Sequence, residues 1–269
     1  MSWDMYDPGA DPGTDPTIDP GFDPAEITDP TALADPAGPT DPTGLADPAD
    51  PYSDPAATPV TAPPAGDVPD LPNFDPAQSD PTAVVGSPGE AMEVWQQHTG
   101  ENGCAIGAQG MVLEYLTGQR ISEEQLTSEA ADQGWFDGSG TAPADLGNLL
   151  ELHGVPVQQV EDASIEQLET VLADGGAAIV GLDADEIWAQ GHDPNDDNVG
   201  DMPGMAGQDA NHAVWVTGID NTDPANPMVV LNDSGHPDGQ GLAVPLDEFM
   251  GAWQDSGNYL VAAGSPQGV

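Results

Sequence analysis

The chain has 269 residues, of which 48 are acidic and only one, Arg120, is a lysine or arginine, giving a formal net charge of −47. Nucleic acids and anionic membranes are bound through clusters of basic side chains, so both classes of partner are excluded. No apolar run approaches the roughly 20 residues of a membrane-spanning helix, and the N-terminus lacks the basic and apolar regions of a classical signal peptide. We expect a soluble protein, either cytoplasmic or exported by a non-classical route.

The first 88 residues are dominated by proline and aspartate. They hold 20 of the 29 prolines, and the dipeptide Asp-Pro recurs every four residues from Asp7 to Asp23 and then every six from Asp29 to Asp47. Proline removes a backbone donor and favours an extended conformation in the residue before it. Residues 1–88 are therefore predicted to be a disordered acidic tail, and residues 89–269 a folded domain. The tail is expected to be a solvated linker, with docking to a partner protein as the alternative role.

Helical signals come first in the folded part. Residues 103–116 carry apolar side chains at helical spacing, and the sequences beginning at Ser122 and Ser164 have the form of capping boxes. The predicted helices cover residues 103–116, 122–133, 143–153 and 164–173.

Strand signals follow. Short apolar, β-branched runs predict strands at residues 177–182, 213–219, 228–231 and 259–262, with a further short helix at 246–254. Helices followed by an antiparallel sheet indicate an α+β domain.

Cys104 is the only cysteine in the chain, so no internal disulfide can form. It stands where a glycine-rich stretch, residues 99–103, gives way to the first predicted helix. The backbone N–H groups and the dipole at a helix N-terminus stabilise a thiolate, which is the reactive form of the side chain. The alternative is a small buried hydrophobic residue, which is how most free cysteines behave.

His212 and Asp233 are the expected partners of Cys104. His212 stands directly before the strand predicted at residues 213–219, and Asp233 follows the strand predicted at residues 228–231, 21 residues after His212. If these strands pair as a hairpin, the two side chains lie at the same end of it. Asn232 is the neighbouring candidate, but alternation along a strand lets only one of the two face the histidine. We predict that Asp233 does so, completing a nucleophile, base and orienting acid.

These residues carry a resemblance to a known family. The motifs that begin Cys104-Ala-Ile-Gly-Ala-Gln, His212-Ala-Val-Trp-Val-Thr-Gly and Leu231-Asn-Asp-Ser-Gly, in this order, resemble the bacterial papain-like cysteine peptidases related to enzymes that process double-glycine bacteriocin leaders. The resemblance spans residues 95–263. It implies a papain-like fold, no cofactor, and a peptide or protein substrate with a peptide or isopeptide bond.

The same resemblance implies a role for each residue. Cys104 would attack a carbonyl and form a thioester, His212 would shuttle the proton, and Asp233 would fix the tautomer of His212. The backbone N–H of Cys104 would form part of the oxyanion hole. Cysteine peptidase is therefore the predicted function; the alternatives are a catalytically inactive papain-like module and an acidic cargo protein used for binding.

One departure from the family pattern concerns the oxyanion hole. Papain-like enzymes usually carry a glutamine six residues before the cysteine, and this position is His98 here. Gln97 and Gln96 lie seven and eight residues before Cys104. Since the glycine-rich loop can absorb a slip of one residue, Gln97 is the predicted donor.

Metal binding is not predicted. One cysteine and scattered histidines give no zinc-ligand spacing. Residues 192–201 are rich in oxygen ligands but match a calcium loop only loosely, so a flexible acidic loop is favoured over a calcium site. His153 is expected at a helix end and His236 in a turn.

Overall fold

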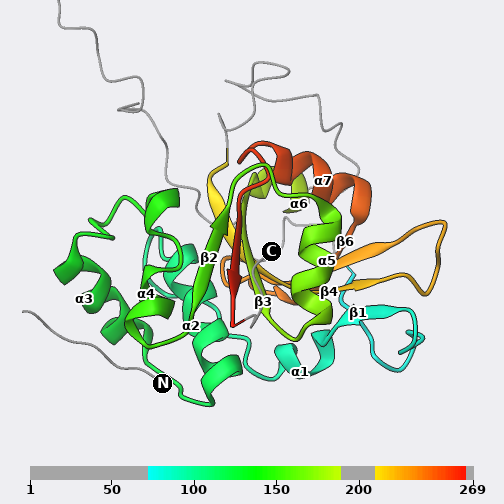
Figure 1. Ribbon diagram of the computed structural model, residues 1–269, viewed down its shortest axis with the longest axis horizontal. Coiled ribbons are helices and arrows are strands. Elements are labelled where there is room, and N and C mark those ends of the chain that lie inside the picture. Colours follow the sequence, from blue (N-terminus) through cyan, green and yellow to red (C-terminus); the bar gives the residue numbers. More distant parts are fainter. Residues whose placement is uncertain (1–71, 189–209, 265–269) are drawn as a thin grey trace, which may run out of the picture. The chain divides into compact units, whose positions relative to one another are not determined.

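A computed structural model describes residues 72–188 and 210–264 of the chain (Figure 1). These residues form an antiparallel sheet with the strand order β2-β7-β3-β4-β5-β6. The short strand β1 pairs with the C-terminal end of β4. The strands are β1 (Val84–Gly86), β2 (Val157–Val160), β3 (Ala177–Leu182), β4 (His212–Asp220), β5 (Met228–Asn232), β6 (Gln240–Pro245) and β7 (Leu260–Ala263).

Helices cover both faces of this sheet. Figure 1 shows α2, α3 and α4 on one side and α5 and α7 on the other. The helices are α1 (Pro88–Met92), α2 (Cys104–Thr117), α3 (Glu123–Gln133), α4 (Asn148–Leu152), α5 (Ile165–Ala173), α6 (Ala184–Trp188) and α7 (Leu246–Gln254). The predicted α+β class is confirmed. Within the described residues, no helix has the length and apolarity needed to cross a membrane.

The central strand β3 separates two hydrophobic cores. Ala177 and Ile179 belong to the core under α2, α3 and α4. Ala178, Val180 and Leu182 belong to the core under α5, α6 and α7. Because successive side chains of a strand point to opposite faces, a strand buried on both sides is apolar at every position, as this one is apart from Gly181.

The predicted helix signals are borne out in α2, α3 and α5. The side chain of Ser122 accepts a hydrogen bond from the backbone N–H of Gln125, and Ser164 with Gln167 forms a complete capping box. Gly118 ends α2 in the left-handed conformation, with φ of 70°. The two serine N-caps each contribute about 1 kcal/mol, and the glycine at Gly118 ends α2 as a left-handed C-cap.

The helix predicted over residues 143–153 is wrong as a continuous element. A 3₁₀ turn, Pro143–Asp145, is followed by the separate helix α4. Gly147, with φ of 103°, interrupts them, and a Cβ at this position would lie 2.9 Å from Cγ1 of Val157. The chain thus bends here to let β2 pack closely. The strands β2 and β6 were not predicted from the sequence.

The fold also includes residues that the sequence assigned to the tail. Strand β1 pairs with β4, Asn73 forms a bridge with Leu242, and Phe74 is buried. The folded domain therefore begins before residue 89 and includes residues 72–88. Residues 1–71, with most of the predicted disordered tail, and residues 192–201, with the weak calcium motif, lie outside the described residues.

Candidate active site

Cys104 is the first residue of α2 and is half-buried. Its N-cap, Gly103, makes no side-chain hydrogen bond, so the first N–H groups of the helix have no side-chain cap. The preceding Asn102 adopts a positive φ of 57°, which turns the glycine-rich loop into the helix. The thiol thus lies at the end of α2 where partial positive charge accumulates.

His212 is the first residue of β4, and its side chain is 4% exposed. Its Cα pairs with that of Leu182 at the end of β3. Asn211 links the start of β4 to α6. Its Oδ1 accepts a hydrogen bond from the backbone N–H of Ala184 at 3.0 Å, and its Nδ2 donates to Asp183 at 3.3 Å. The imidazole is therefore held at one end of the sheet, beside the N-terminus of α2.

Asp233 directly follows β5 and is fully buried. Its Oδ1 lies 2.7 Å from Nε2 of His212 and also accepts the backbone N–H of Gly235 at 2.7 Å. Its Oδ2 accepts Nε1–H of Trp188 at 2.8 Å. Both carboxylate oxygens are thus engaged, and the second ring nitrogen of His212, Nδ1, is left for Cys104.

Asn232 points away from this group. Its Nδ2 donates to the carbonyl of Ala91 at 2.8 Å, and its Oδ1 accepts from the backbone N–H of Gly241 at 3.2 Å. The predicted β4–β5 hairpin is present, with Trp215 opposite Asn232. The structure thus brings His212 and Asp233 together, with the thiol of Cys104 hydrogen-bonded to His212, and alternation along the chain leaves Asn232 on the other side.

The electrostatics favour a thiolate beside an imidazolium. Burial favours the neutral form of the His212 ring, but the charge of Asp233 and hydrogen bonds with Asp233 and Cys104 outweigh it and raise the pKa of His212 to about 10. Burial opposes ionisation of the Cys104 thiol, yet the hydrogen bond and charge of His212 and the backbone N–H groups of Ala213 and Ala105 lower its pKa below the ordinary value. Asp233 stays ionised, since the charge and hydrogen bond of His212, together with hydrogen bonds from Trp188 and the backbone N–H of Gly235, offset its burial and lower its pKa to about 2.

Trp188 shields the His212–Asp233 pair. Besides its bond to the carboxylate, its indole packs edge-on against the imidazole, with ring centroids 5.2 Å apart and planes at 62°. Trp188 and Asp233 are 45 residues apart in the sequence, and no local pattern predicts a contact between residues so far apart.

The loop after Asp233 is built around glycines. A Cβ on Gly235 would lie 2.7 Å from Cε1 of His212, and a Cβ on Gly239 would lie 2.1 Å from the carbonyl oxygen of Asp233. Trp95 donates its Nε1–H to that same carbonyl at 2.9 Å. Because Gly235 and Gly239 have no side chains, the loop can pack closely against the carboxylate and the imidazole.

The three residues considered for the oxyanion hole differ in their surroundings. Gln97 is exposed, and the Nε2 of Gln96 donates to Glu114 at 2.9 Å. His98 is partly buried, and its Nδ1 lies 3.1 Å from Oγ of Ser234, the residue after Asp233. The structure thus places His98 next to the Asp233 loop, and Gln97 remains a candidate from the sequence alone.

Two further histidines of the described residues, His153 and His236, have other partners. His153 caps the C-terminus of α4, and its Nε2 lies 2.7 Å from Oε2 of Glu129. His236 lies in the turn after β5, where its Nδ1 accepts the backbone N–H of Asp238 at 3.1 Å. Across residues 72–188 and 210–264, no group of three or more potential ligands is arranged to hold a metal ion.

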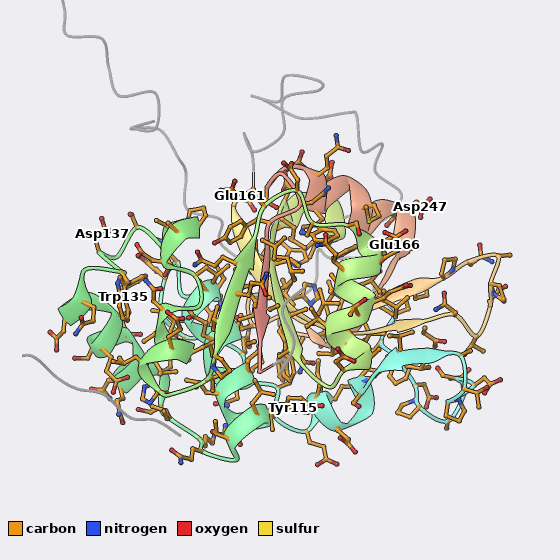
Figure 2. All side chains as sticks on the ribbon, viewed as in Figure 1. Tyr115, Trp135, Asp137, Glu161, Glu166 and Asp247 are labelled. Carbon is orange, nitrogen blue, oxygen red and sulfur yellow. The ribbon has the colours of Figure 1, made fainter. Side chains whose placement is uncertain are left out.

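The acidic side chains that Figure 2 labels all lie on the outside of the fold. Asp137 follows α3, Glu161 precedes α5, Glu166 lies in the first turn of α5, and Asp247 lies in the first turn of α7. All four are exposed. Acidic residues therefore surround the fold on several sides, which gives the protein a broad negative potential.

Comparisons with known proteins agree with this architecture. The profile of the Peptidase_C39 like family matches residues 91–261, a span that includes Cys104, His212 and Asp233. Uncharacterized proteins from Mycobacterium bovis and Mycobacterium tuberculosis are each 28% identical over 212 residues, covering 69% of this chain and 86% of theirs.

Two solved structures are also similar. A Bacillus anthracis protein described as a C39-like peptidase has 18% identity and a TM-score of 0.44, covering 63% of this chain and 92% of its own. The peptidase domain of Streptococcus ComA has 12% identity and a TM-score of 0.40, covering 64% and 98%. The family match extends over more than half of the chain, and the protein therefore belongs to the Peptidase_C39 like family and has the papain-like fold of a cysteine peptidase.

Proposed function

We propose that the protein is a cysteine peptidase that cleaves peptide or isopeptide bonds through a thioester on Cys104. The observation that carries this proposal is the buried pair of His212 and Asp233, joined at 2.7 Å, beside a cysteine at a helix N-terminus. A cysteine nucleophile needs a base, and the base needs an orienting group; both are present.

The reaction would run in two halves. The Cys104 thiolate attacks the substrate carbonyl carbon, a C–S bond forms, and the π electrons of the carbonyl move to its oxygen. As the tetrahedral intermediate collapses, the C–N bond breaks and His212 gives its proton to the leaving amine. Water then attacks the thioester, with His212 accepting its proton, and the thiolate is restored as the acid product leaves.

Asp233 would keep His212 in the productive orientation. Its hydrogen bond to Nε2 leaves Nδ1 directed toward the thiol, and its charge stabilises the imidazolium. Because its own pKa is lowered, the carboxylate stays ionised throughout and takes no proton.

The negative surface would influence which peptides bind. A net charge of −47 attracts cationic segments and repels acidic ones. We therefore expect cleavage of neutral or basic peptides in preference to strongly acidic ones, and the preference weakens as salt screens the surface.

The test is the rate of Cys104 alkylation by iodoacetamide across pH, measured on the wild type and on His212→Ala. The proposal expects a fast reaction whose inflection lies well below the ordinary thiol pKa of about 8.5, and loss of this behaviour in the variant. Slow alkylation that is indifferent to His212 would contradict the proposal and favour an inactive papain-like module that binds its partners.

A further inference from the structure

His98 lies close to Cys104, although the two are separated by the glycine-rich loop. The backbone N–H of His98 donates to the carbonyl of Ser234 at 2.9 Å, and the ring Nδ1 lies 3.1 Å from the hydroxyl of Ser234. Two bonds to one residue fix both the backbone and the ring. His98 is thereby attached to the loop that carries Asp233.

The glycine at position 107 makes this contact feasible. A Cβ on Gly107 would lie 2.6 Å from Oγ of Ser234 and 3.4 Å from Cβ of His98. Any side chain there would displace Ser234 from α2. Because Gly107 has no side chain, the first turn of α2 can pack directly against Ser234 and His98.

The other edge of the His98 ring lies toward the beginning of α2. A Cβ on Gly103 would lie 3.6 Å from Cδ2 of His98, the carbon bonded to Nε2. Gly103 immediately precedes Cys104, whose backbone N–H opens the helix. Since Nδ1 contacts Ser234, Nε2 is on the edge of the ring that lies toward this N-terminus.

The contacts of Ser234 bear on the tautomer of His98. The Ser234 hydroxyl lies 3.1 Å from Nδ1 of His98 and can donate to the carbonyl of Cys104 at 3.4 Å. In the tautomer whose Nδ1 accepts from Ser234, Nε2 carries the hydrogen, and the role inferred below uses that tautomer. Burial and the charge of His212 lower the pKa of His98, although Glu123 and Asp233 oppose this, which keeps the ring neutral at neutral pH.

We propose that Nε2–H of His98, together with the backbone N–H of Cys104, forms the oxyanion hole of this enzyme, and that Ser234 positions the ring for it. This inference rests on the proposed function, because it concerns the oxyanion that forms when Cys104 attacks a carbonyl. His98 donates a hydrogen bond and transfers no proton. Gln97, the donor predicted from the sequence, is exposed and plays no part in this arrangement.

Two reagents that attack the same thiolate separate this role from others. Acylation of Cys104 by p-nitrophenyl acetate passes through a tetrahedral oxyanion, whereas alkylation by iodoacetamide displaces iodide at a saturated carbon and forms none. A lost oxyanion donor therefore lowers the ratio of acylation to alkylation rates. A disturbed Cys104–His212 pair lowers both rates together and leaves the ratio largely unchanged.

The full-length chain is compared with His98→Ala, His98→Gln, Ser234→Ala and Gln97→Ala, the last of which tests the donor predicted from the sequence. We expect His98→Ala to lower the ratio by about 10²-fold, the usual loss for one oxyanion donor, with alkylation nearly unchanged. His98→Gln, which restores an N–H donor, should recover most of the loss. Ser234→Ala should reduce the ratio several-fold, and Gln97→Ala should leave it unchanged.

Several results would overturn the inference. An unchanged ratio in His98→Ala, or the same fall in His98→Gln as in His98→Ala, would show that the ring supplies no hydrogen bond to the oxyanion. A fall confined to Gln97→Ala would assign the donor to the exposed glutamine. A wild type that alkylates rapidly through His212 but is never acylated would also refute it, whereas failure of the proposed function would appear as alkylation that ignores His212.

Discussion

Gly235→Ala introduces one methyl group against the imidazole of His212. The new Cβ would lie 2.7 Å from Cε1, 3.2 Å from Nε2 and 3.3 Å from Oδ1 of Asp233. Carbon atoms in contact are normally about 3.5–4.0 Å apart, so the overlap with Cε1 is about 1 Å. Gly235 is absent from the glycines with positive φ, so the backbone itself accepts alanine.

The imidazole has little freedom to move away. Nε2 is bonded to Asp233 at 2.7 Å, and Trp188 packs against the ring. Relief of the clash must therefore displace His212 or the Asp233 loop by several tenths of an ångström to about 1 Å. Overpacking of this kind costs about 1–3 kcal/mol of unfolding free energy, and a displacement of about 1 Å at a reacting group lowers the rate by about 10²-fold.

Urea denaturation of a double-mutant cycle isolates the clash. We expect Gly235→Ala to destabilise the wild type but to cost close to nothing in a His212→Ala background, because Cε1 is then absent. The matched control is Gly89→Ala in α1, where a Cβ would make an ordinary 3.6 Å contact with Pro76. An equal cost of Gly235→Ala in both backgrounds would refute the close approach of the loop to the ring.

Three further predictions concern stability. Trp188→Phe removes the donor to Oδ2 of Asp233 and should lower the urea-unfolding free energy by about 1.5–3 kcal/mol; equal stability would contradict this contact. In a Cys104→Ser background the thiol no longer contributes, but the charge and hydrogen bond of Asp233 still raise the pKa of His212, so its stabilisation is complete below pH about 6.5 and is lost as pH rises above that value. The urea-unfolding free energy of Cys104→Ser should therefore fall as pH rises above about 6.5, and adding His212→Gln should make this free energy less dependent on pH. An equal pH dependence in the two variants would contradict the prediction. Sodium chloride should raise the thermal midpoint of the whole chain, because it screens the repulsion from a net charge of −47; a midpoint that stays constant or falls would contradict this.

The helices could be predicted where a local signal sets both ends. Ser122 and Ser164 cap α3 and α5 through bonds to residues three positions away, so the information lies within one turn. The helix predicted over residues 143–153 failed for the opposite reason. Its break at Gly147 depends on Val157 and Val261, which lie on other elements, and helical spacing carries no trace of such a contact.

The strands could be predicted only where they were apolar. β2 carries two glutamines in four residues, and its place at the sheet edge comes from pairing with β7. β6 includes a glycine and a proline, both of which weaken a strand signal. The segment before residue 89 joins the sheet through β1 and a bridge to Leu242, although its proline content is typical of disorder.

The residues of the candidate site could likewise be predicted only where local elements position them. Cys104, His212 and Asp233 stood out because each lies at or next to an end of a predicted element, so the meeting of their side chains follows from a hairpin and a helix N-terminus. The positions of Trp188 and His98 depend on the paths of loops. No periodicity predicts that Trp188 reaches the carboxylate, or that His98 rather than Gln97 turns inward beside Ser234.

The most direct test of the proposed peptidase uses a mixture of peptides of diverse sequence incubated with the full-length chain, followed by mass spectrometry of newly formed N-termini. We expect new termini with the wild type, flanked mainly by neutral or basic residues, and none above background with Cys104→Ala or His212→Ala. New termini that are equally abundant with Cys104→Ala, or none with the wild type, would contradict the assignment of Cys104 as a peptidase nucleophile.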